Sequence, residues 1–350
     1  MKRYNALYHQ IYDKDNIRLA HQNARKGKSK YHEVQLVDKH VEFYVGKIHS
    51  ILKNKTFRNA KYHVFKRMFQ KKEREIFKLP YFPDRIIQHC ILQILEPIWT
   101  KSFIKTTYSS IKYRGIHLAL RDIKKAMKDV ESTKYCLKMD VKKFYPSINH
   151  EILKQIIRKR IKCKDTLWIL DEIIDSTAGI PIGNYLSQFF GNLYLTYFDH
   201  WIKEEKHCKY YFRYCDDLII LHHGKSFLHA LREEVQEYLM DNLNLTLKAN
   251  WQIFPVDSRG LDFIGYKSFH GFTLLRKSIV NQFKRKTHKI KLRNVLSFQK
   301  QINGLMSYYG WIVHCNGWTL IKKYVTVAVF KETKKICKFL NQRNPARKMI

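Results

Sequence analysis

Acidic residues are scarce in this chain of 350 residues, which has 30 Asp plus Glu against 66 Lys plus Arg and a formal net charge of +36. A surface this basic gains free energy when it releases the counterions that phosphates condense, so the composition predicts a nucleic-acid partner. An anionic membrane surface is the alternative that charge alone leaves open. The hydrophobic content of 45% is enough for a substantial core and excludes a disordered tail.

Long apolar runs and paired cysteines are also missing. No run approaches the roughly 18 residues that a membrane-spanning helix needs, and the first ten residues lack the apolar stretch of a signal peptide. We therefore expect a cytoplasmic protein with no membrane partner. The seven cysteines are scattered without a CxxC pair, which argues against both a disulfide framework and a zinc site.

Basic residues dominate the last 88 residues, where Glu332 is the only acid after Asp262. Residues 276–293 place a basic side chain on most turns of an expected helix, and residues 308–318 interleave aromatic side chains with glycine. This pattern predicts a module that grips nucleic acid, with a solvated helix face as the plainer alternative.

The centre of the chain alternates between strand and helix patterns. Residues 133–140 alternate as in a half-buried strand, which places Asp140 at its end, on the face opposite Leu137 and Met139. Asn149 can cap a first helix, a second helix follows Gly183, and residues 210–223 read as a hairpin around a Cys-Asp-Asp turn. The expected apolar positions are Ile152, Leu153, Ile156, Ile157 and Ile161 in the first helix and Leu186, Phe190, Leu193 and Tyr197 in the second.

Two adjacent carboxylates, Asp216 and Asp217, lie at the tip of this expected hairpin. Like charges at close range repel, so a cation is expected beside them. Mg²⁺ suits the pair because it binds one or two carboxylates together with substrate phosphates, and Asp140 could supply a third carboxylate. Two such ions, with Mn²⁺ as an alternative, would perform the two-metal chemistry of a polymerase. For the pair taken alone, an exposed turn is the alternative.

Six segments, in their order along the chain, resemble the motifs of reverse transcriptases of the group II intron-like type. The string YCDD at 214–217 is similar to the aromatic-x-Asp-Asp motif, and residues 140–153 resemble the aspartate motif that precedes it. Residues 179–195 look like the helix that contacts template and nucleotide, and residues 260–267 like the hairpin that grips the primer end. The segments similar to the fingers motifs are residues 74–88 and 107–120.

The resemblance implies an α+β fold of the right-hand polymerase type, with fingers, a palm built on an antiparallel sheet and a helical thumb. We expect fingers and palm entry at residues 1–130, the palm at 131–270 and the thumb at 271–350. The implied activity is that of an RNA-directed DNA polymerase. Its implied partners are an RNA template, a DNA or RNA primer and deoxynucleoside triphosphates (dNTPs), with a structured noncoding RNA and an accessory protein as further candidates.

The resemblance also implies roles for single residues. Asp140, Asp216 and Asp217 would be metal ligands, and Lys248 could protonate pyrophosphate. Tyr145 falls where the family places the aromatic side chain that blocks a ribose 2′-hydroxyl, with a core tyrosine as the alternative. The other nucleotide-binding candidates are Lys72 and Arg74, which could also be solvated surface charges, together with Gly183, Ser187 and Gln188. The candidates for contact with primer and template are Phe263, Gly265, Tyr266, Arg276, Lys277, Lys284 and Arg285.

One departure from the family pattern concerns the template-contacting motif. Many members carry Gln-Gly followed by Ser-Pro, whereas this chain has Ile182-Gly183 and Ser187-Gln188. The variant resembles reverse transcriptases of diversity-generating retroelements, whose copying tends to be error-prone opposite adenine, so we expect service in such a retroelement.

Several alternatives to this role stay open. A phage-defence reverse transcriptase shares parts of the pattern, and a catalytically inactive relative could hold RNA through its basic surface. An RNA-dependent RNA polymerase or a metal-dependent nuclease is disfavoured by Tyr145 and by the order strand, helix, helix, hairpin. A retron enzyme fits less well because Val-Thr-Gly is absent from the C-terminal segment.

Overall fold

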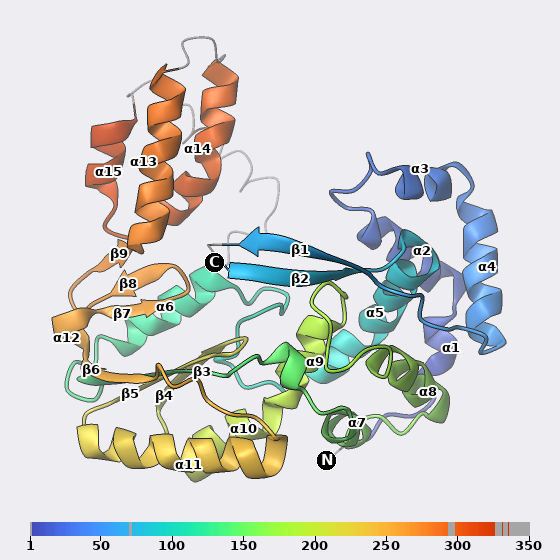
Figure 1. Ribbon diagram of the computed structural model, residues 1–350, viewed down its shortest axis with the longest axis horizontal. Helices are drawn as coiled ribbons and strands as arrows, with labels where there is room; N and C mark the ends of the chain where they lie inside the picture. Colours follow the sequence, from blue (N-terminus) through green and yellow to red (C-terminus); the bar gives the residue numbers. More distant parts are fainter. Residues whose placement is uncertain (1, 70–71, 293–297, 326–330, 332–334, 336–350) are drawn as a thin grey trace. The chain divides into compact units, whose positions relative to one another are not determined.

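The computed structural model describes residues 2–69, 72–292, 298–325, 331 and 335 (Figure 1). They form two compact units, each built from separate stretches of the chain. The first unit takes the residues up to 107, 141–207 and 234–249, and the second takes 108–140, 208–233 and the described residues from 250 onward. Within the described residues, no helix combines the length and the apolar character that a membrane crossing needs.

The first unit is mainly helical. Its helices are α1 (Tyr8–Ile11), α2 (Lys14–Ala24), α3 (His32–Lys39), α4 (Val41–Lys53), α5 (Ile86–Thr100), α7 (His150–Arg158), α8 (Lys164–Ile174), α9 (Ser187–Tyr194) and α10 (Thr196–His200), with the short turns η1 (Tyr81–Arg85), η2 (Tyr145–Ser147) and η3 (Trp201–Glu205). Helix α2 packs against both α4 and α5 and buries Ile17 and Ala20. One hairpin, of β1 (His63–Phe69) and β2 (Lys72–Lys78), extends from these helices (Figure 1).

The second unit contains two antiparallel sheets. A four-stranded sheet has the order β4-β5-β3-β6, from β3 (Tyr135–Asp140), β4 (Tyr210–Tyr214), β5 (Asp217–His222) and β6 (Gln252–Pro255). A three-stranded sheet has the order β7-β8-β9, from β7 (Leu261–Phe263), β8 (Tyr266–Ser268) and β9 (Thr273–Leu275). The helices are α6 (Ile116–Ala126), α12 (Val256–Arg259), α13 (Lys277–Leu292), α14 (Phe298–Ile312) and α15 (Trp318–Tyr324), while α11 (Lys225–Leu243) begins in this unit and ends in the first.

Buried apolar pairs fix how β3 and β5 align. Leu137 lies opposite Ile220 and Met139 opposite Leu218, and all four side chains are buried. On the other face, Cys136 joins a buried cluster that includes Ala119 and Ile123 of α6 and the β5 residues Ile219 and Leu221. The strand predicted at 133–140 is confirmed at Tyr135–Asp140, but Cys136 is also buried, so the expected half-buried alternation holds only from Leu137 to Asp140.

Both helices predicted after β3 are present, but neither has the predicted length. The side chain of Asn149 accepts a hydrogen bond from the Ile152 amide at 3.1 Å, as expected of a helix cap. The helix nevertheless ends at Arg158 rather than continuing through Ile161. Tyr4 donates its amide to the carbonyl of Arg160 and accepts the amide of Lys162, so the N-terminal segment draws this stretch into an extended bridge.

The second predicted helix is divided in two. It begins at Ser187 and breaks at Leu195, so α9 and α10 replace one continuous helix. The Thr196 hydroxyl donates to the carbonyl of Asn192, four residues earlier, at 3.0 Å. A hydroxyl bonded in this way bends a helix, because it competes for the carbonyl that the backbone uses.

Removal of the Asn149 cap gives a direct stability test. Asn149→Ala should lower the free energy of unfolding by about 1 kcal/mol, because the first turn of α7 loses a satisfied amide. Asn149→Asp should retain nearly all stability, since a carboxylate accepts the same hydrogen bond. Urea unfolding followed by circular dichroism measures both variants, and equal losses in the two would contradict the capping role.

Candidate active site

The register of the four-stranded sheet brings two predicted metal ligands together. Asp140, the last residue of β3, lies directly opposite Asp217, the first residue of β5. Directly opposite residues on antiparallel strands share a face of the sheet, with Cβ atoms about 4.5–5.5 Å apart. Asp216 precedes Asp217 in the turn, and all three carboxylates are half-buried. Tyr214 is also opposite Asp217, across β4, so its ring lies beside this acidic group.

The turn that carries Asp216 is tighter than predicted. Tyr214 and Asp217 pair with each other, so the loop contains Cys215 and Asp216 alone and Asp217 belongs to the strand. Cys215 has a φ of 59°, a value that side chains other than glycine rarely adopt. A positive φ at the first of two loop residues is typical of the type II′ hairpin turn, whose twist matches that of the strands.

Arg213 supports this turn and was missed in the sequence. Its side chain is fully buried and lies on the face of the sheet opposite Asp217, because it pairs with Leu218. From there its Nη1 donates to the carbonyl of Cys215 at 3.1 Å. The available signal was an arginine inside the otherwise apolar strand YYFRY, since an arginine is almost never fully buried without a partner.

The donor set of the three aspartates fits a hard divalent cation. Carboxylate oxygens are the ligands that Mg²⁺ and Mn²⁺ prefer, and like charges directly opposite on two strands repel unless a cation offsets them. Among the described residues, no group of three or more His, Cys, Asp or Glu side chains is itself arranged to hold a metal ion. An Mg²⁺ site that substrate phosphates complete does not need such a group, because the protein supplies only part of the coordination.

The hairpin at residues 260–267 is present as β7 and β8, joined by Ile264 and Gly265. Both loop residues have positive φ, 46° and 87°, as in the type I′ hairpin turn. The side chains of Phe263 and Tyr266 are buried, and the Tyr266 hydroxyl donates to the carbonyl of Trp311 at 3.0 Å. A Cβ on Gly265 would lie 2.5 Å from the Trp311 ring. The side chains of Phe263 and Tyr266 therefore pack into the buried apolar clusters of the second unit.

Two basic residues connect this hairpin to its surroundings. Lys138, on the same face of β3 as Asp140, donates from Nζ to the carbonyl of Asp262 at 2.6 Å. Arg276 precedes α13 and donates from Nε to the Asp262 carboxylate at 2.6 Å, so its charge already has a partner. The exposed cations of α13 include the candidates Lys277, Lys284 and Arg285, whereas Phe283 on the same helix is buried against Leu305 and Ile321.

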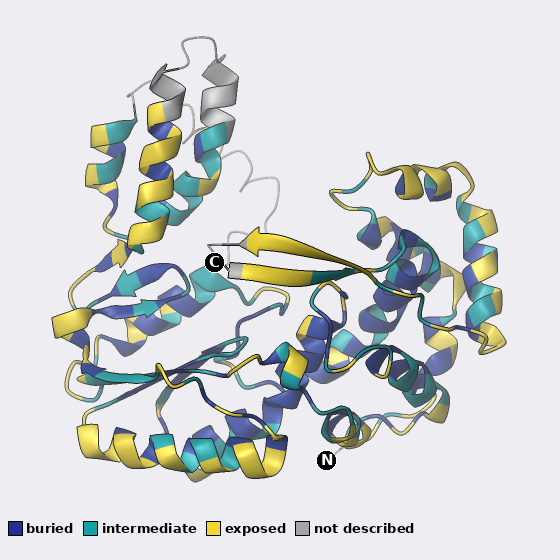
Figure 2. Cartoon of the chain, viewed as in Figure 1, coloured by how far each residue is buried: buried dark blue, intermediate teal, exposed yellow. Residues whose placement is uncertain are grey.

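In the first unit, Arg74 stands on an exposed hairpin. Arg67 is its direct partner across β1 and β2, and Figure 2 shows most of the two strands as exposed. The register also places Lys78 and His63 on the face that holds the two arginines, whereas Glu73 and Glu75 share the other face. Arg67 was missed in the sequence because only the pairing places it beside Arg74. The backbone of Lys72 begins β2, but its side chain lies outside the described residues.

Tyr145 is half-buried at the start of η2, and its carbonyl accepts the Ile180 amide at 2.9 Å. A Cβ on Gly191 of α9 would lie 3.1 Å from the Phe144 ring and 3.2 Å from the Tyr145 ring. Gly191 therefore makes room for Tyr145, which sequence reasoning missed. The signal was a glycine inside a helix, where it costs about 1 kcal/mol relative to alanine and so has a packing reason.

The candidate nucleotide-binding residues between 183 and 188 differ in how far they are buried. Gly183 has a φ of 135°, and a Cβ there would lie 2.3 Å from the carbonyl oxygen of Phe77, so the close approach that requires glycine is to β2. Ser187 is buried and donates to the carbonyl of Pro181 at 2.7 Å, whereas Gln188 is exposed. Lys248 is half-buried and follows Leu247, which forms a bridge with Val141.

Comparison with known proteins gives consistent relatives. A family model described as "Reverse transcriptase (RNA-dependent DNA polymerase)" matches residues 59–267, more than half of the chain. Protein YkfC of Escherichia coli is 23% identical over 288 residues, which cover 69% of this chain and 73% of YkfC. The group II intron-encoded protein LtrA of Lactococcus lactis is 24% identical over 139 residues, 37% of this chain and 23% of LtrA.

A solved structure of apo telomerase from Candida tropicalis has a similar fold, with a TM-score of 0.52 and 15% identity. The likeness covers 81% of this chain and 58% of the telomerase chain. Together with the antiparallel sheets, it confirms the predicted α+β fold of the right-hand polymerase type. The chain belongs to the reverse transcriptase family of RNA-dependent DNA polymerases.

Proposed function

We propose that this protein extends a primer with dNTPs on an RNA template, using Asp140, Asp216 and Asp217 to bind two Mg²⁺ ions. The observation that carries the proposal is the register that sets Asp140 opposite Asp217, next to Asp216 in the turn. Two acids directly opposite each other, with a third in the adjoining turn, are costly in isolation. They suit phosphoryl transfer, in which bound cations contact the phosphates of the substrate. The arrangement therefore favours catalysis over RNA binding alone.

The chemistry divides between the metal ions and the side chains. When bound, two ions would activate the primer 3′-hydroxyl and stabilise the leaving pyrophosphate. The three carboxylates would hold the two ions in place. The Arg213 side chain positions the turn from the opposite face of the sheet. Burial raises the pKa of the Tyr214 hydroxyl, so this phenol stays neutral beside the acids and adds no further negative charge.

Further residues would bind and orient the substrates. Arg74, with Arg67 opposite, offers two guanidinium groups to a triphosphate, and such groups stabilise charge that develops in the transition state. Lys248 would donate a proton from Nζ to the leaving pyrophosphate. The Tyr145 ring would exclude a ribose 2′-hydroxyl. The backbone of the β7–β8 hairpin and the α13 cations Lys277, Lys284 and Arg285 would hold primer and template.

The biological setting is part of the same proposal. Residues 1–130 would serve as fingers with palm entry, 131–270 as palm and 271–350 as thumb. Ile182-Gly183 and Ser187-Gln188 favour service in a diversity-generating retroelement over phage defence. A structured noncoding RNA and an accessory protein are then the expected partners, and the net charge of +36 favours the binding of RNA.

Replacing the paired carboxylate tests catalysis. Asp217→Asn should lower the rate of primer extension with Mg²⁺ and dNTPs by about 100-fold or more, since it weakens the binding of the metal ions that would stabilise charge on the reacting phosphate. Asp216→Ala should do the same. Binding of the RNA template should change little in either variant, because neither aspartate attracts a polyanion.

The matched control is Glu233→Gln, which removes one exposed acid of the same unit and should leave extension unchanged. A readout independent of activity is thermal unfolding with added Mg²⁺. The ion should raise the unfolding temperature of the unmodified protein because it offsets the repulsion of the aspartates, and Asp217→Asn should lose most of that rise. Full extension by both aspartate variants would refute the proposal.

Sugar selection tests Tyr145. Tyr145→Ala should raise the incorporation of ribonucleotides relative to deoxynucleotides by on the order of tenfold to a hundredfold, because the ring no longer occupies the space of the 2′-hydroxyl. Gly191→Ala should shift the ratio in the same direction but less, since its new methyl group displaces the Tyr145 ring. Competition between the two nucleotide types in single-nucleotide extension measures the ratio. An unchanged ratio in Tyr145→Ala would assign this tyrosine to the core.

Copying errors test the retroelement role. Ile182→Gln restores the polar side chain that many family members have at this position, and it should lower misincorporation opposite template adenine by up to about tenfold, the effect of one additional hydrogen bond. Sequencing of cDNA made from a defined RNA template counts the errors. Equal error rates opposite all four template bases in the unmodified protein would count against a diversity-generating role.

A further inference from the structure

Lys138 occupies an unusual position in the four-stranded sheet. It lies within β3, which has β5 on one side and β6 on the other, and it pairs with Ile219 and Gln252 on these strands. Lysine is depleted inside strands and is almost never buried without a partner. A half-buried lysine at this position therefore needs an explanation in contacts beyond the sheet.

The face of the sheet that carries Lys138 changes character along its length. Directly opposite residues on antiparallel strands share a face, so the face consists of rows across β5 and β3. One row, Leu221 with Cys136, is apolar and buried. The row at the other end is Asp217 with Asp140. Lys138 belongs to the row between them, roughly 7 Å along the strand from each, so it lies where the apolar part of this face ends and the acids begin.

The β7–β8 hairpin packs on the same face. Leu261 and Phe263 of β7 belong to the buried cluster that contains Cys136, and Ile264 of the hairpin turn packs against this cluster. In Figure 1, the three-stranded sheet lies between the four-stranded sheet and α13. Apolar contacts therefore hold the hairpin on this face of the sheet, in the row next to Lys138.

Asp262 of the hairpin is bonded to two basic residues at once. Its carbonyl accepts from Nζ of Lys138 at 2.6 Å, and its carboxylate accepts from Nε of Arg276 at 2.6 Å. The Arg276 amide also donates to the carbonyl of Gly265, in the hairpin turn, at 3.0 Å. The hairpin is thus bonded both to the strand that ends in Asp140 and to the residue that precedes α13.

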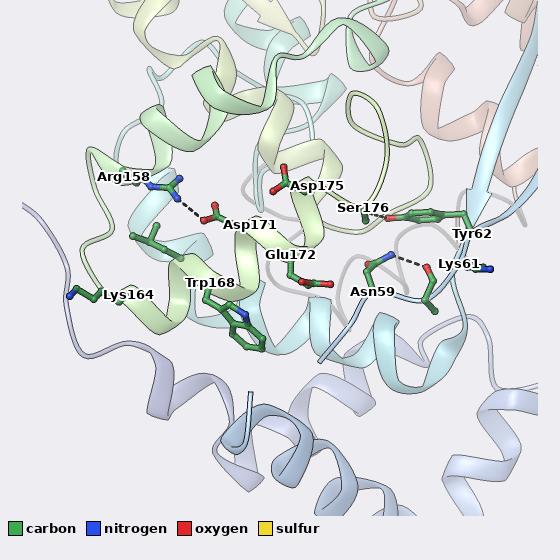
Figure 3. A pocket seen from close by; sticks show the side chains of 12 residues that line it. Asn59, Lys61, Tyr62, Arg158, Lys164, Trp168, Asp171, Glu172, Asp175 and Ser176 are labelled. Carbon is green, nitrogen blue, oxygen red and sulfur yellow. Dashed lines mark hydrogen bonds and ion pairs between the residues drawn. The ribbon is translucent and has the colours of Figure 1, made fainter. Parts of the chain in front are cut away.

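An ion pair of the first unit shows how Asp262 differs. Asp171 and Arg158 line a cavity of about 780 Å³ there, and their side chains pair at 2.5 Å (Figure 3). This pair joins two partly exposed side chains of α7 and α8, and such pairs contribute little to stability. Asp262 is bonded through its main chain as well as its side chain. Lys138 therefore acts on the backbone of the hairpin itself.

We propose that Lys138 is a positioning residue for polymerisation, which holds the β7–β8 hairpin at a fixed distance from Asp140 and so sets where the primer terminus lies. Asp262 is the junction of this brace, and Arg276 extends it to α13. Lys138 itself would contact neither the metal ions nor the reacting phosphate. The inference rests on the proposed function, because it takes the hairpin to hold the primer.

The geometry of phosphoryl transfer explains why one hydrogen bond of this kind matters. The reacting atoms must lie about 3–3.5 Å apart, and a displacement of about 1 Å can lower the rate about a hundredfold. Apolar contacts in the neighbouring row keep the hairpin on the sheet. The bond from Lys138 to a main-chain carbonyl adds a directional restraint beside the acids, because such bonds tolerate little change in length.

Direct contact with a phosphate of the primer is the competing role for Lys138. The two roles change different quantities. Loss of a phosphate contact weakens the binding of primer and template and reduces its dependence on salt. Loss of a positioning contact lowers the maximal rate of nucleotide addition and leaves that binding unchanged.

The experiment measures both quantities on the full chain. Fluorescence anisotropy of a labelled DNA primer on an RNA template gives the dissociation constant, and single-nucleotide addition to the preformed complex gives the maximal rate. Lys138→Met keeps most of the apolar stem and removes the donor. It should lower the maximal rate by about tenfold to a hundredfold, and it should change the dissociation constant by less than about twofold, since no phosphate contact is lost.

Two further variants complete the set. Lys138→Arg keeps a donor at the same position and should recover most of the lost rate. Lys134→Met removes an exposed lysine just before the same strand, and as the matched control it should change neither quantity. A normal rate in Lys138→Met would overturn the proposal. Weaker binding at an unchanged maximal rate would do so too, because it would assign Lys138 to a phosphate, as would a failure of Lys138→Arg to recover any rate.

A photo-crosslink distinguishes failure of this proposal from failure of the proposed function. A primer that ends in 4-thiothymidine, irradiated in the complex without dNTPs, should label the peptide that contains residues 260–267. The label should persist in Lys138→Met and in Asp217→Asn, because the hairpin still holds the primer. If no label reaches the hairpin, the proposed primer contact is wrong and the brace with it. If the label is present and Lys138→Met has a normal rate, the brace alone is wrong.

Discussion

The antiparallel register of β3 against β5 is the constraint on which the second unit depends. The buried pairs Leu137 with Ile220 and Met139 with Leu218 fix it, because a slip of one residue would turn each side chain to the opposite face. The same register sets Asp140 opposite Asp217. The placement of the acids is therefore decided by apolar side chains on the other face of the sheet, and Arg213 secures the adjoining turn from that face.

Pairs of like charge recur across strands in this chain. Arg67 lies opposite Arg74 in one hairpin, and Asp140 lies opposite Asp217 in the other unit. Each arrangement opposes the folding of its own strands, since like charges directly opposite are destabilising. Under the proposed function, phosphates would offset the charge of the arginine pair and cations that of the aspartate pair. Acids are scarce in a chain of net charge +36, which makes the grouping of three of them more informative than it would be elsewhere.

Local signals predicted much of this structure, and contacts between distant segments explain the rest. The alternation before Asp140, the Asn149 cap and the hairpin at 210–223 are local features, and the structure contains all three. The end of α7 depends instead on Tyr4, far away in the sequence. The space beside Tyr145 depends on Gly191 of another helix. No pattern within a short window contains these contacts, because they arise only once the segments have packed.

Gly183 shows how a motif can suggest a contact without deciding its partner. The family resemblance places this glycine beside template or nucleotide, yet its φ of 135° and the nearby carbonyl of Phe77 require glycine for the fold itself. The next residue, Asn184, is then oriented by the hydroxyls of Ser176 and Tyr62. The orientation of its amide is therefore fixed by contacts within the chain, which the motif that contains it does not reveal.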